Sequence, residues 1–428
     1  MTPAEIHRIG HDQLGPIFAN WARLLLRTAR RRGVSRLFFV ARDGDFLNAV
    51  AARMLEAQGC KDSLERSVLR LSRRVCHLAA HPAIDDNSIV DAFSIRAGNP
   101  RLVGLLRQHG LSDRSASAAM HAANLAANTR LGSLRQARSL LDNAPLREVV
   151  RSESERCRAA LLAFLDQSGA FGGNAALVDI GWRGSSQRNL EAALLPVGPA
   201  RLPGWLYLAL WRDDGRRDEL PENSEGLLGD LRRDRSLAEG APWYSAFLLE
   251  AICRANEPTL ENVEDRGGKI ITELASEMTA SREAERTCWN VVAALRTGIL
   301  DHVGVAAIDA TADALTDADL RSQAQHKLLR LGFEPTREEI AIGRALVHTE
   351  SHDPEWSSPL VLPGNRSPWS SPRQWFAGLA SPWRGAYVMD TGGQRAAKIY
   401  RTFESALLAL PPWVRGTLRD VAVRFAGV

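Results

Sequence analysis

The most informative polar residues of the chain lie in one short segment: Asp179, Gly181, Gly184, Ser185 and Ser186. An apolar run ends at the aspartate, a loop with two glycines follows, and the two serines open the next expected helix. Backbone N–H groups at a helix N-terminus bind phosphate, and small residues let a phosphate approach them closely. The alternative is an ordinary turn with a serine cap, but the combination of residue types favours a phosphate-binding loop.

A second polar turn, Arg42-Asp43-Gly44, directly follows the apolar run 36–41. An aspartate at a strand end is well placed to hold a metal ion or a ribose hydroxyl, and the glycine lets a backbone N–H come close to a ligand. The alternative interpretation is a tight turn in which Asp43 caps the helix that follows. On these residues alone, the capped turn is favoured.

A third cluster, Ser72-Arg73-Arg74, ends another expected strand. One hydroxyl and two guanidinium groups at a strand end suit an anionic ligand. The alternative is a solvated basic turn.

Alternating strands and helices position these three clusters. Expected strands cover residues 36–41, 67–72, 175–179 and 204–210, and expected helices cover 14–32, 46–58 and 186–195. Short apolar runs that alternate with helices predict a parallel, Rossmann-like α/β sheet. Because ligands bind outside the carboxyl ends of parallel strands, all three clusters should meet at one edge of the sheet.

The expected domain organisation has three parts. Residues 1–242 form the α/β core, with a helical insertion at about 87–167. Residues 243–350 form a helical region, and residues 351–428 form a Trp- and Pro-rich segment with a final amphipathic helix. That helix could touch anionic lipid, or it could be a solvated cap.

The bulk properties limit the class of protein. The chain has 428 residues, a formal net charge of +4 and five scattered cysteines without CxxC spacing. We expect no disulfide framework, no zinc site and no nucleic-acid partner. The N-terminus lacks the apolar core of a signal peptide, and no apolar run has the length of a membrane span. These features predict a cytoplasmic protein, with peripheral contact to the inner membrane as a further expectation.

Four stretches carry a resemblance to a known family: Leu14-Gly15-Pro16, 37–44, 71–74 and 178–185, with Glu250 to Pro258 as its next segment. Together they resemble a bacterial family found in capsule and O-antigen gene clusters, whose members often also carry a phosphatase domain of the haloacid dehalogenase (HAD) type. The part present here resembles phosphoribosyltransferases that add ribofuranose to polysaccharides. The resemblance covers roughly the first 260 residues.

The resemblance implies that the donor is phosphoribosyl pyrophosphate and that the acceptor is a glycan hydroxyl. Asp179 matches the second of the family's two adjacent acids, and Arg183-Gly184-Ser185-Ser186 matches its 5-phosphate loop. Val178 stands where the first acid is expected, so Asp43 would have to supply an equivalent from the neighbouring strand.

The same resemblance assigns the Arg42-Asp43-Gly44 turn to the pyrophosphate, with Asp43 as a ligand of Mg²⁺ and with help from Arg73 or Arg74. Mg²⁺ and arginines would stabilise the charge that develops on the leaving pyrophosphate. The product would still carry a 5-phosphate, so the resemblance also implies a separate phosphatase as a partner.

Two alternatives remain open. Asp43-Gly44-Asp45 after a strand also resembles the DxD of HAD-like phosphohydrolases, with Asp43 as nucleophile and Asp45 as general acid. A non-catalytic scaffold of a polysaccharide assembly complex is the third possibility, because Val178 replaces an expected acid.

Overall fold

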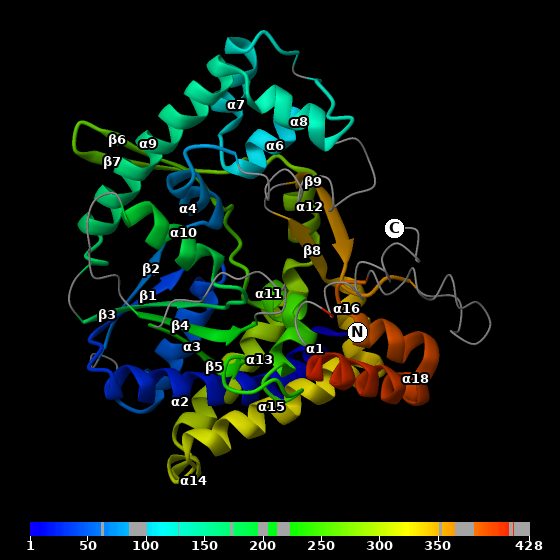
Figure 1. Ribbon diagram of the computed structural model, residues 1–428. Helices are drawn as coiled ribbons and strands as arrows, with labels where there is room; N and C mark the ends of the chain where they lie inside the picture. Colours follow the sequence, from blue (N-terminus) through cyan, green and yellow to red (C-terminus); the bar gives the residue numbers. More distant parts are fainter. Residues whose placement is uncertain are drawn as a thin grey trace.

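The computed structural model describes residues 1–60, 64–84, 101–126, 128–171, 174–195, 204–211, 223–350, 353–363, 381–410 and 414. Within these ranges, none of the helices is both long enough and apolar enough to cross a membrane. The elements form a parallel sheet covered by helices on both faces, with a helical region beneath it (Figure 1).

The central sheet has five strands, all parallel, in the order β2-β1-β3-β4-β5. Their bounds are β1 Arg36–Val40, β2 Glu65–Leu69, β3 Ala175–Asp179, β4 Gly204–Leu210 and β5 Ser224–Asp230. This confirms the predicted parallel α/β fold. The sequence did not predict β5, whose only apolar side chains are two adjacent leucines between glycines.

Side chains of the buried strands alternate between two cores, one on each face of the sheet. In β1, Leu37 and Phe39 face one core, and Phe38 and Val40 face the other. The first core is closed by α2 (Gly15–Arg31) and α3 (Gly44–Ala57). The second is closed by the helices α4 Arg73–Ala80, α9 Ala144–Gln167 and α10 Ser185–Leu194. A strand with apolar residues on both faces is typical of a covered parallel sheet.

Helix α2 confirms the helix expected at 14–32, but it is buried more completely than one apolar stripe requires. It follows α1 (Pro3–Ile9) and the π-helical turn Gly10–Leu14. Even Asn20 and Arg23 are buried, because α13 (Trp289–Ala307) and α15 (Asp317–Phe333) also cover it. Asn20 donates a hydrogen bond to the Leu320 carbonyl, and Arg23 donates one to that of Ala306.

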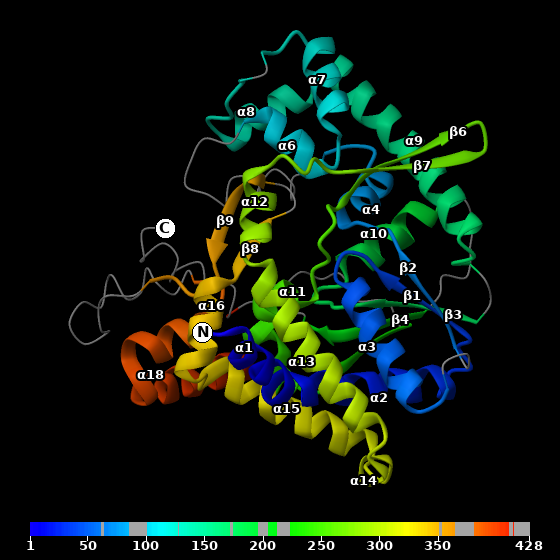
Figure 2. The same cartoon turned by 180° about the vertical axis from the view of Figure 1, so that it is seen from behind.

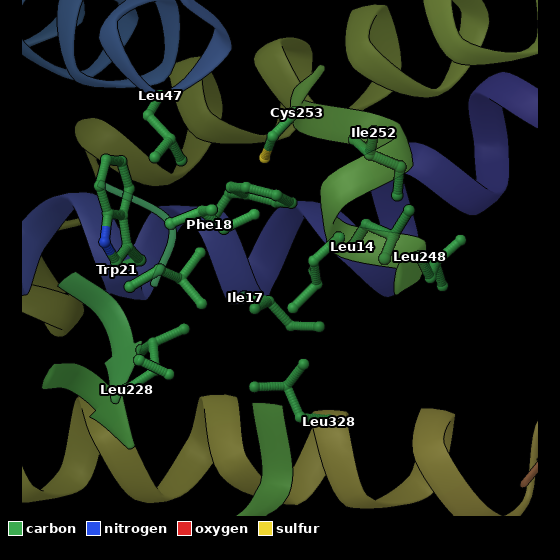
Figure 3. Packing of buried hydrophobic residues seen from close by; sticks show 14 of the residues in the cluster. Leu14, Ile17, Phe18, Trp21, Leu47, Leu228, Leu248, Ile252, Cys253 and Leu328 are labelled. Atoms are coloured by element: carbon green, nitrogen blue, oxygen red, sulfur yellow. The ribbon is translucent and has the colours of Figure 1, made fainter. Parts of the chain in front are cut away.

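The same core joins residues that are far apart in the sequence. Side chains of α2, including Phe18 and Trp21, meet Leu228 of β5, Ile252 of α11 (Ala246–Cys253) and Leu328 of α15 (Figure 3). One continuous cluster of buried residues reaches from Ile6 to Leu408. Helices after residue 243 therefore complete the core beneath the sheet.

The described part of the expected insertion at 87–167 is mainly helical. Its helices are α6 Leu102–His109, α7 Asp113–Ala122, α8 Leu134–Leu141 and α9. They lie above α4 and α10, together with the hairpin of β6 (Leu260–Arg266) and β7 (Lys269–Leu274) (Figure 2).

The C-terminal region contains a hairpin that the sequence did not predict. It follows α16 (Arg337–Ala345) and consists of β8 (Val347–Glu350) and β9 (Asp353–Pro359). Strand β9 lies inside the segment that was expected to be rich in Trp and Pro. The other elements here are the 3₁₀ turn Ala241–Ser245, α12 Ala280–Thr287, α14 Ala310–Asp313 and α18 Arg384–Ala409. The final amphipathic helix that the sequence predicts lies almost wholly outside the described residues.

Candidate active site

The candidate site lies where the direction of strand addition reverses. The chain passes from β1 outward to β2, and then crosses back to place β3 on the other side of β1. In doubly wound sheets, ligands bind at this switch point, outside the carboxyl ends of the two strands. The loop after β1 holds Arg42-Asp43-Gly44, and the loop after β3 begins at Asp179. Two of the three predicted clusters therefore flank the switch point directly.

Asp43 occupies the N-cap position of α3, but its side chain makes no capping hydrogen bond. The capped turn that the sequence favoured is therefore not formed. Burial raises the pKa of the Asp43 carboxyl to about 6, and the negative charge of Glu250 acts in the same direction. The positive charges of Arg42, Arg254 and Arg73 oppose this rise in pKa. Asp43 is thus a carboxylate held at a strand end without a capping role.

Asp179 ends β3 and is buried, with 9% of its surface exposed. Its Oδ1 accepts a hydrogen bond from the N–H of Ile180 at 2.7 Å. Burial raises the pKa of this carboxyl to about 7, and the charge of Asp43 is the second cause. The two carboxyl groups, predicted from separate motifs, therefore lie close enough to influence each other.

Val178 cannot take the place of an acid in this site. It lies one residue before Asp179 on β3, so its side chain points to the opposite face of the strand, into the core beneath the sheet. Asp43 is the residue that brings a second carboxyl close enough to raise the pKa of Asp179.

The loop after Asp179 leads into the N-terminus of α10. Gly181 has a φ of 128°, and a Cβ there would lie 2.1 Å from the carbonyl oxygen of Ala209, so no larger residue fits. Gly184 is the N-cap, with a φ of 64°. The first backbone hydrogen bond of α10 runs from the Arg188 N–H to the Gly184 carbonyl at 3.0 Å. The N–H groups before it have no partner inside the helix, which is the arrangement that binds phosphate.

Ser185 and Ser186 form the first turn of α10, and both are half-buried. Within the described part of the chain, neither hydroxyl forms a hydrogen bond. Arg183, in contrast, is exposed, with its guanidinium carbon 5.9 Å from the centre of the Trp243 ring. The two serines are therefore better placed than Arg183 to face a ligand at the helix N-terminus.

In the third predicted cluster, Ser72-Arg73-Arg74, Ser72 and Arg73 have different roles. Ser72 is buried and caps α4, where its Oγ accepts a hydrogen bond from the Val75 N–H at 3.1 Å. Arg73 is exposed, and its positive charge lowers the pKa of both Asp43 and Asp179, which places it at the site.

Arg74 lies away from the two aspartates. Its guanidinium forms an ion pair with Glu261 at 3.1 Å and donates to the carbonyl of Leu111. The structure therefore brings Arg73 to the carboxylate pair and uses Arg74 to hold α4 against the segment between α6 and α7.

Arg42 is held in a buried ionic cluster centred on Glu285 of α12. Oε1 of Glu285 accepts hydrogen bonds from Arg42 at 2.8 Å and from the Thr349 hydroxyl at 2.6 Å, and it pairs with Arg254 at 3.1 Å. Its other oxygen pairs with Arg282. Burial acts to raise the pKa of Glu285, but the positive charges of Arg42 and Arg254 outweigh it. The resulting pKa is about 2. This cluster fixes the loop that carries Asp43.

Glu250 of α11 is a site residue that the sequence motifs did not single out. Its Oε1 accepts a hydrogen bond from Nε1 of Trp182 at 2.7 Å, so it anchors the loop after β3. Its charge also raises the pKa of Asp43. The only signal in the sequence was its position in the segment Glu250 to Pro258, which belongs to the family resemblance.

The placement of Asp45 separates it from the carboxylate pair. Asp45 is exposed on the first turn of α3 and lines a different hollow, with Arg70 and Glu257. The lysine that a HAD-like site requires is also missing at the sheet edge within the described residues, where Lys269, Lys327 and Lys398 all lie elsewhere. No observation here favours Asp43 and Asp45 as a nucleophile and acid pair.

A Mg²⁺ ion at this site would need oxygen atoms from a bound substrate or from water in addition to those of the protein. In the described ranges, no group of three or more His, Cys, Asp or Glu side chains is arranged to hold a metal ion. The two carboxyls of Asp43 and Asp179, both with a raised pKa, fit an ion that takes its remaining oxygens from phosphate and water.

Comparison with known proteins adds no relative. The sequence matches no protein-family model, and a search of curated proteins gives no match either. The argument for function therefore rests on the residues and the geometry of this site.

Proposed function

We propose that the chain transfers a phosphoribosyl group from phosphoribosyl pyrophosphate to a sugar hydroxyl in surface polysaccharide synthesis. The observation that carries the proposal is the pairing, at the β1/β3 switch point, of the buried Asp179 carboxyl and the half-buried Asp43 carboxyl with an open helix N-terminus. A pentose phosphate matches both features, because its hydroxyls can donate to carboxylates and its phosphate can accept from N–H groups.

Each part of the donor has a partner in this arrangement. The 5-phosphate would bind the N–H groups and hydroxyls of Ser185 and Ser186. Asp179 would accept hydrogen bonds from the ribose hydroxyls. The pyrophosphate would lie over the loop of Asp43 and Gly44, with Arg73 supplying positive charge. Mg²⁺, when bound, would neutralise part of the charge on the pyrophosphate, with Asp43 and Asp179 as its protein ligands.

In the proposed reaction, the bond between the anomeric carbon and the pyrophosphate oxygen breaks, and its electron pair leaves with the pyrophosphate. The oxygen of the acceptor hydroxyl forms the new bond to the same carbon, and its proton passes to the departing pyrophosphate. The residues on the loops after β1 and β3 orient the donor, which lowers the barrier by fixing the reacting groups in place. Removal of the 5-phosphate would then require a separate phosphatase.

Calorimetric titration with phosphoribosyl pyrophosphate, with and without Mg²⁺, tests this proposal. We expect Mg²⁺-dependent binding to the wild-type protein and at least about a tenfold loss of affinity in Asp179→Asn, since a charged hydrogen-bond partner contributes 1.5–3 kcal/mol. Arg74→Ala is the matched control, and its affinity should stay close to wild type. Absence of binding to the wild-type protein under both conditions would refute the proposal.

A further inference from the structure

A polar hollow of about 470 Å³ lies beside the candidate site, on the side of β1 opposite β3. Its walls come from the start of α3, the end of β2 and the segment after α11. The lining residues are Asp45, Val68, Arg70, Ala255, Asn256 and Glu257. None of these residues has a part in the proposed donor site.

The hollow presents an unusual set of hydrogen-bonding groups. Arg70 and Glu257 form a two-contact ion pair, with N–O distances of 2.8 and 3.4 Å, which fixes both side chains in its wall. Within the described chain, the Asp45 carboxylate and the Asn256 side-chain amide form no hydrogen bond and are exposed. Donors and acceptors therefore stand side by side and are open to a ligand. Sugar hydroxyls, which both donate and accept, match such a mixed set.

The hollow is connected directly to the loop that would hold the donor. The Ala255 N–H in its wall donates to the Arg42 carbonyl at 3.2 Å. Asp45 follows Asp43 by two residues, and β2 pairs with β1 in register along its whole length. The hollow is therefore adjacent to the loop that carries Asp43.

We propose that this hollow is the acceptor subsite and that it binds a pyranose sugar through its hydroxyl groups. This inference rests on the proposed function and adds the class of acceptor to it. The phosphate loop lies on the β3 side of Asp43 and the hollow on the β2 side. The acceptor hydroxyl would thus approach the anomeric carbon of the bound donor from the β2 side of the Asp43 loop.

Saturation-transfer NMR tests the subsite with methyl β-D-galactopyranoside and methyl β-D-glucopyranoside as probes, in the presence of phosphoribosyl pyrophosphate and Mg²⁺. We expect transfer to the ring protons of at least one glycoside, and about fivefold weaker binding in Asn256→Ala and in Arg70→Ala, the effect of losing one hydrogen bond. The control is Arg36→Ala, because Arg36 forms a similar exposed pair with Glu65 at the N-terminal ends of β1 and β2, away from the hollow.

The two proposals can fail separately in this experiment. If neither glycoside shows transfer with the wild-type protein, the proposed subsite is wrong. It is also wrong if Asn256→Ala and Arg70→Ala bind the glycoside as tightly as Arg36→Ala does. Calorimetric titration of the same samples reports donor binding independently. Loss of the glycoside in the variants while donor binding stays unchanged supports the subsite, whereas absence of donor binding to every sample overturns the transferase proposal alone.

Discussion

Replacement of Glu285 by alanine is expected to lower the free energy of unfolding by about 4 kcal/mol, because it removes the ion-pair partner of the mostly buried Arg42 and Arg254. The side chain of Glu285 is only 8% exposed, and it pairs with Arg42, Arg254 and Arg282. Arg42 and Arg282 are themselves mostly buried. An ion pair of this kind contributes little relative to an apolar replacement of all its members, but removing one member strongly destabilises the fold.

Urea unfolding at pH 7 measures this effect, and Glu65→Ala is the control. Glu65 pairs with Arg36, but its side chain is 61% exposed, so its loss should change stability by no more than about 1 kcal/mol. The pKa of Glu285 is lowered from 4.5 to about 2. Its stabilising effect should therefore be complete above about pH 4.5 and fade as the pH falls toward 2. Equal stabilities of the two variants at pH 7 would contradict the assigned role.

The parts of the fold that the sequence predicts are those with a strong local pattern. Strands β3 and β4 begin and end at the predicted residues, because each is an apolar run bounded by glycine or charge. The helix expected at 14–32 ends before Gly33 as predicted, since its apolar positions repeat at helical spacing. These signals are local, so no knowledge of tertiary contacts is needed to interpret them.

The parts that the sequence does not reveal depend on contacts between distant segments. Glu285 belongs to a helix that carries no motif, and Glu250 was marked only by its place in a segment of the family resemblance. Both reach the site because α11 and α12 pack beside the loops after β1 and β3. For the same reason, the sequence could not show that Arg42 is held by Glu285. It also could not separate Arg73 from Arg74, because adjacent residues at the start of a helix point in different directions.

Two adjacent residues on β3, Val178 and Asp179, point to opposite faces of the sheet and have different environments. Val178 is completely buried in the core, whereas Asp179 is the last residue of β3 and lies close enough to Asp43 for the charge of Asp43 to raise its pKa. A second acid at Val178 would point into an apolar core, where an unpaired carboxylate is strongly unfavourable. The fold therefore obtains its second carboxyl from the neighbouring strand, through a loop that Glu285 keeps in place.

Replacement of Asp179 by asparagine is expected to stabilise the ligand-free protein at pH 8 while it removes donor binding. The pKa of this carboxyl is raised from 3.8 to about 7 by burial and by the charge of Asp43. The native state then binds the proton more tightly than the unfolded chain does, so stability falls as the pH rises from about 4 to about 7. Asparagine cannot ionise, and its Oδ1 can still accept from the Ile180 N–H.

The gain should be about 2 kcal/mol at pH 8 and close to zero near pH 4, since each unit of pKa corresponds to about 1.4 kcal/mol and the burial is incomplete. Urea unfolding at both pH values measures it, with the exposed Asp166→Asn on α9 as control. Phosphoribosyl pyrophosphate with Mg²⁺ should stabilise the wild-type protein but not Asp179→Asn, because only a bound ligand shifts the unfolding equilibrium. A variant that is less stable than wild type at pH 8 would show that the Asp179 carboxyl holds the fold together, and would place the ligand elsewhere on the sheet edge.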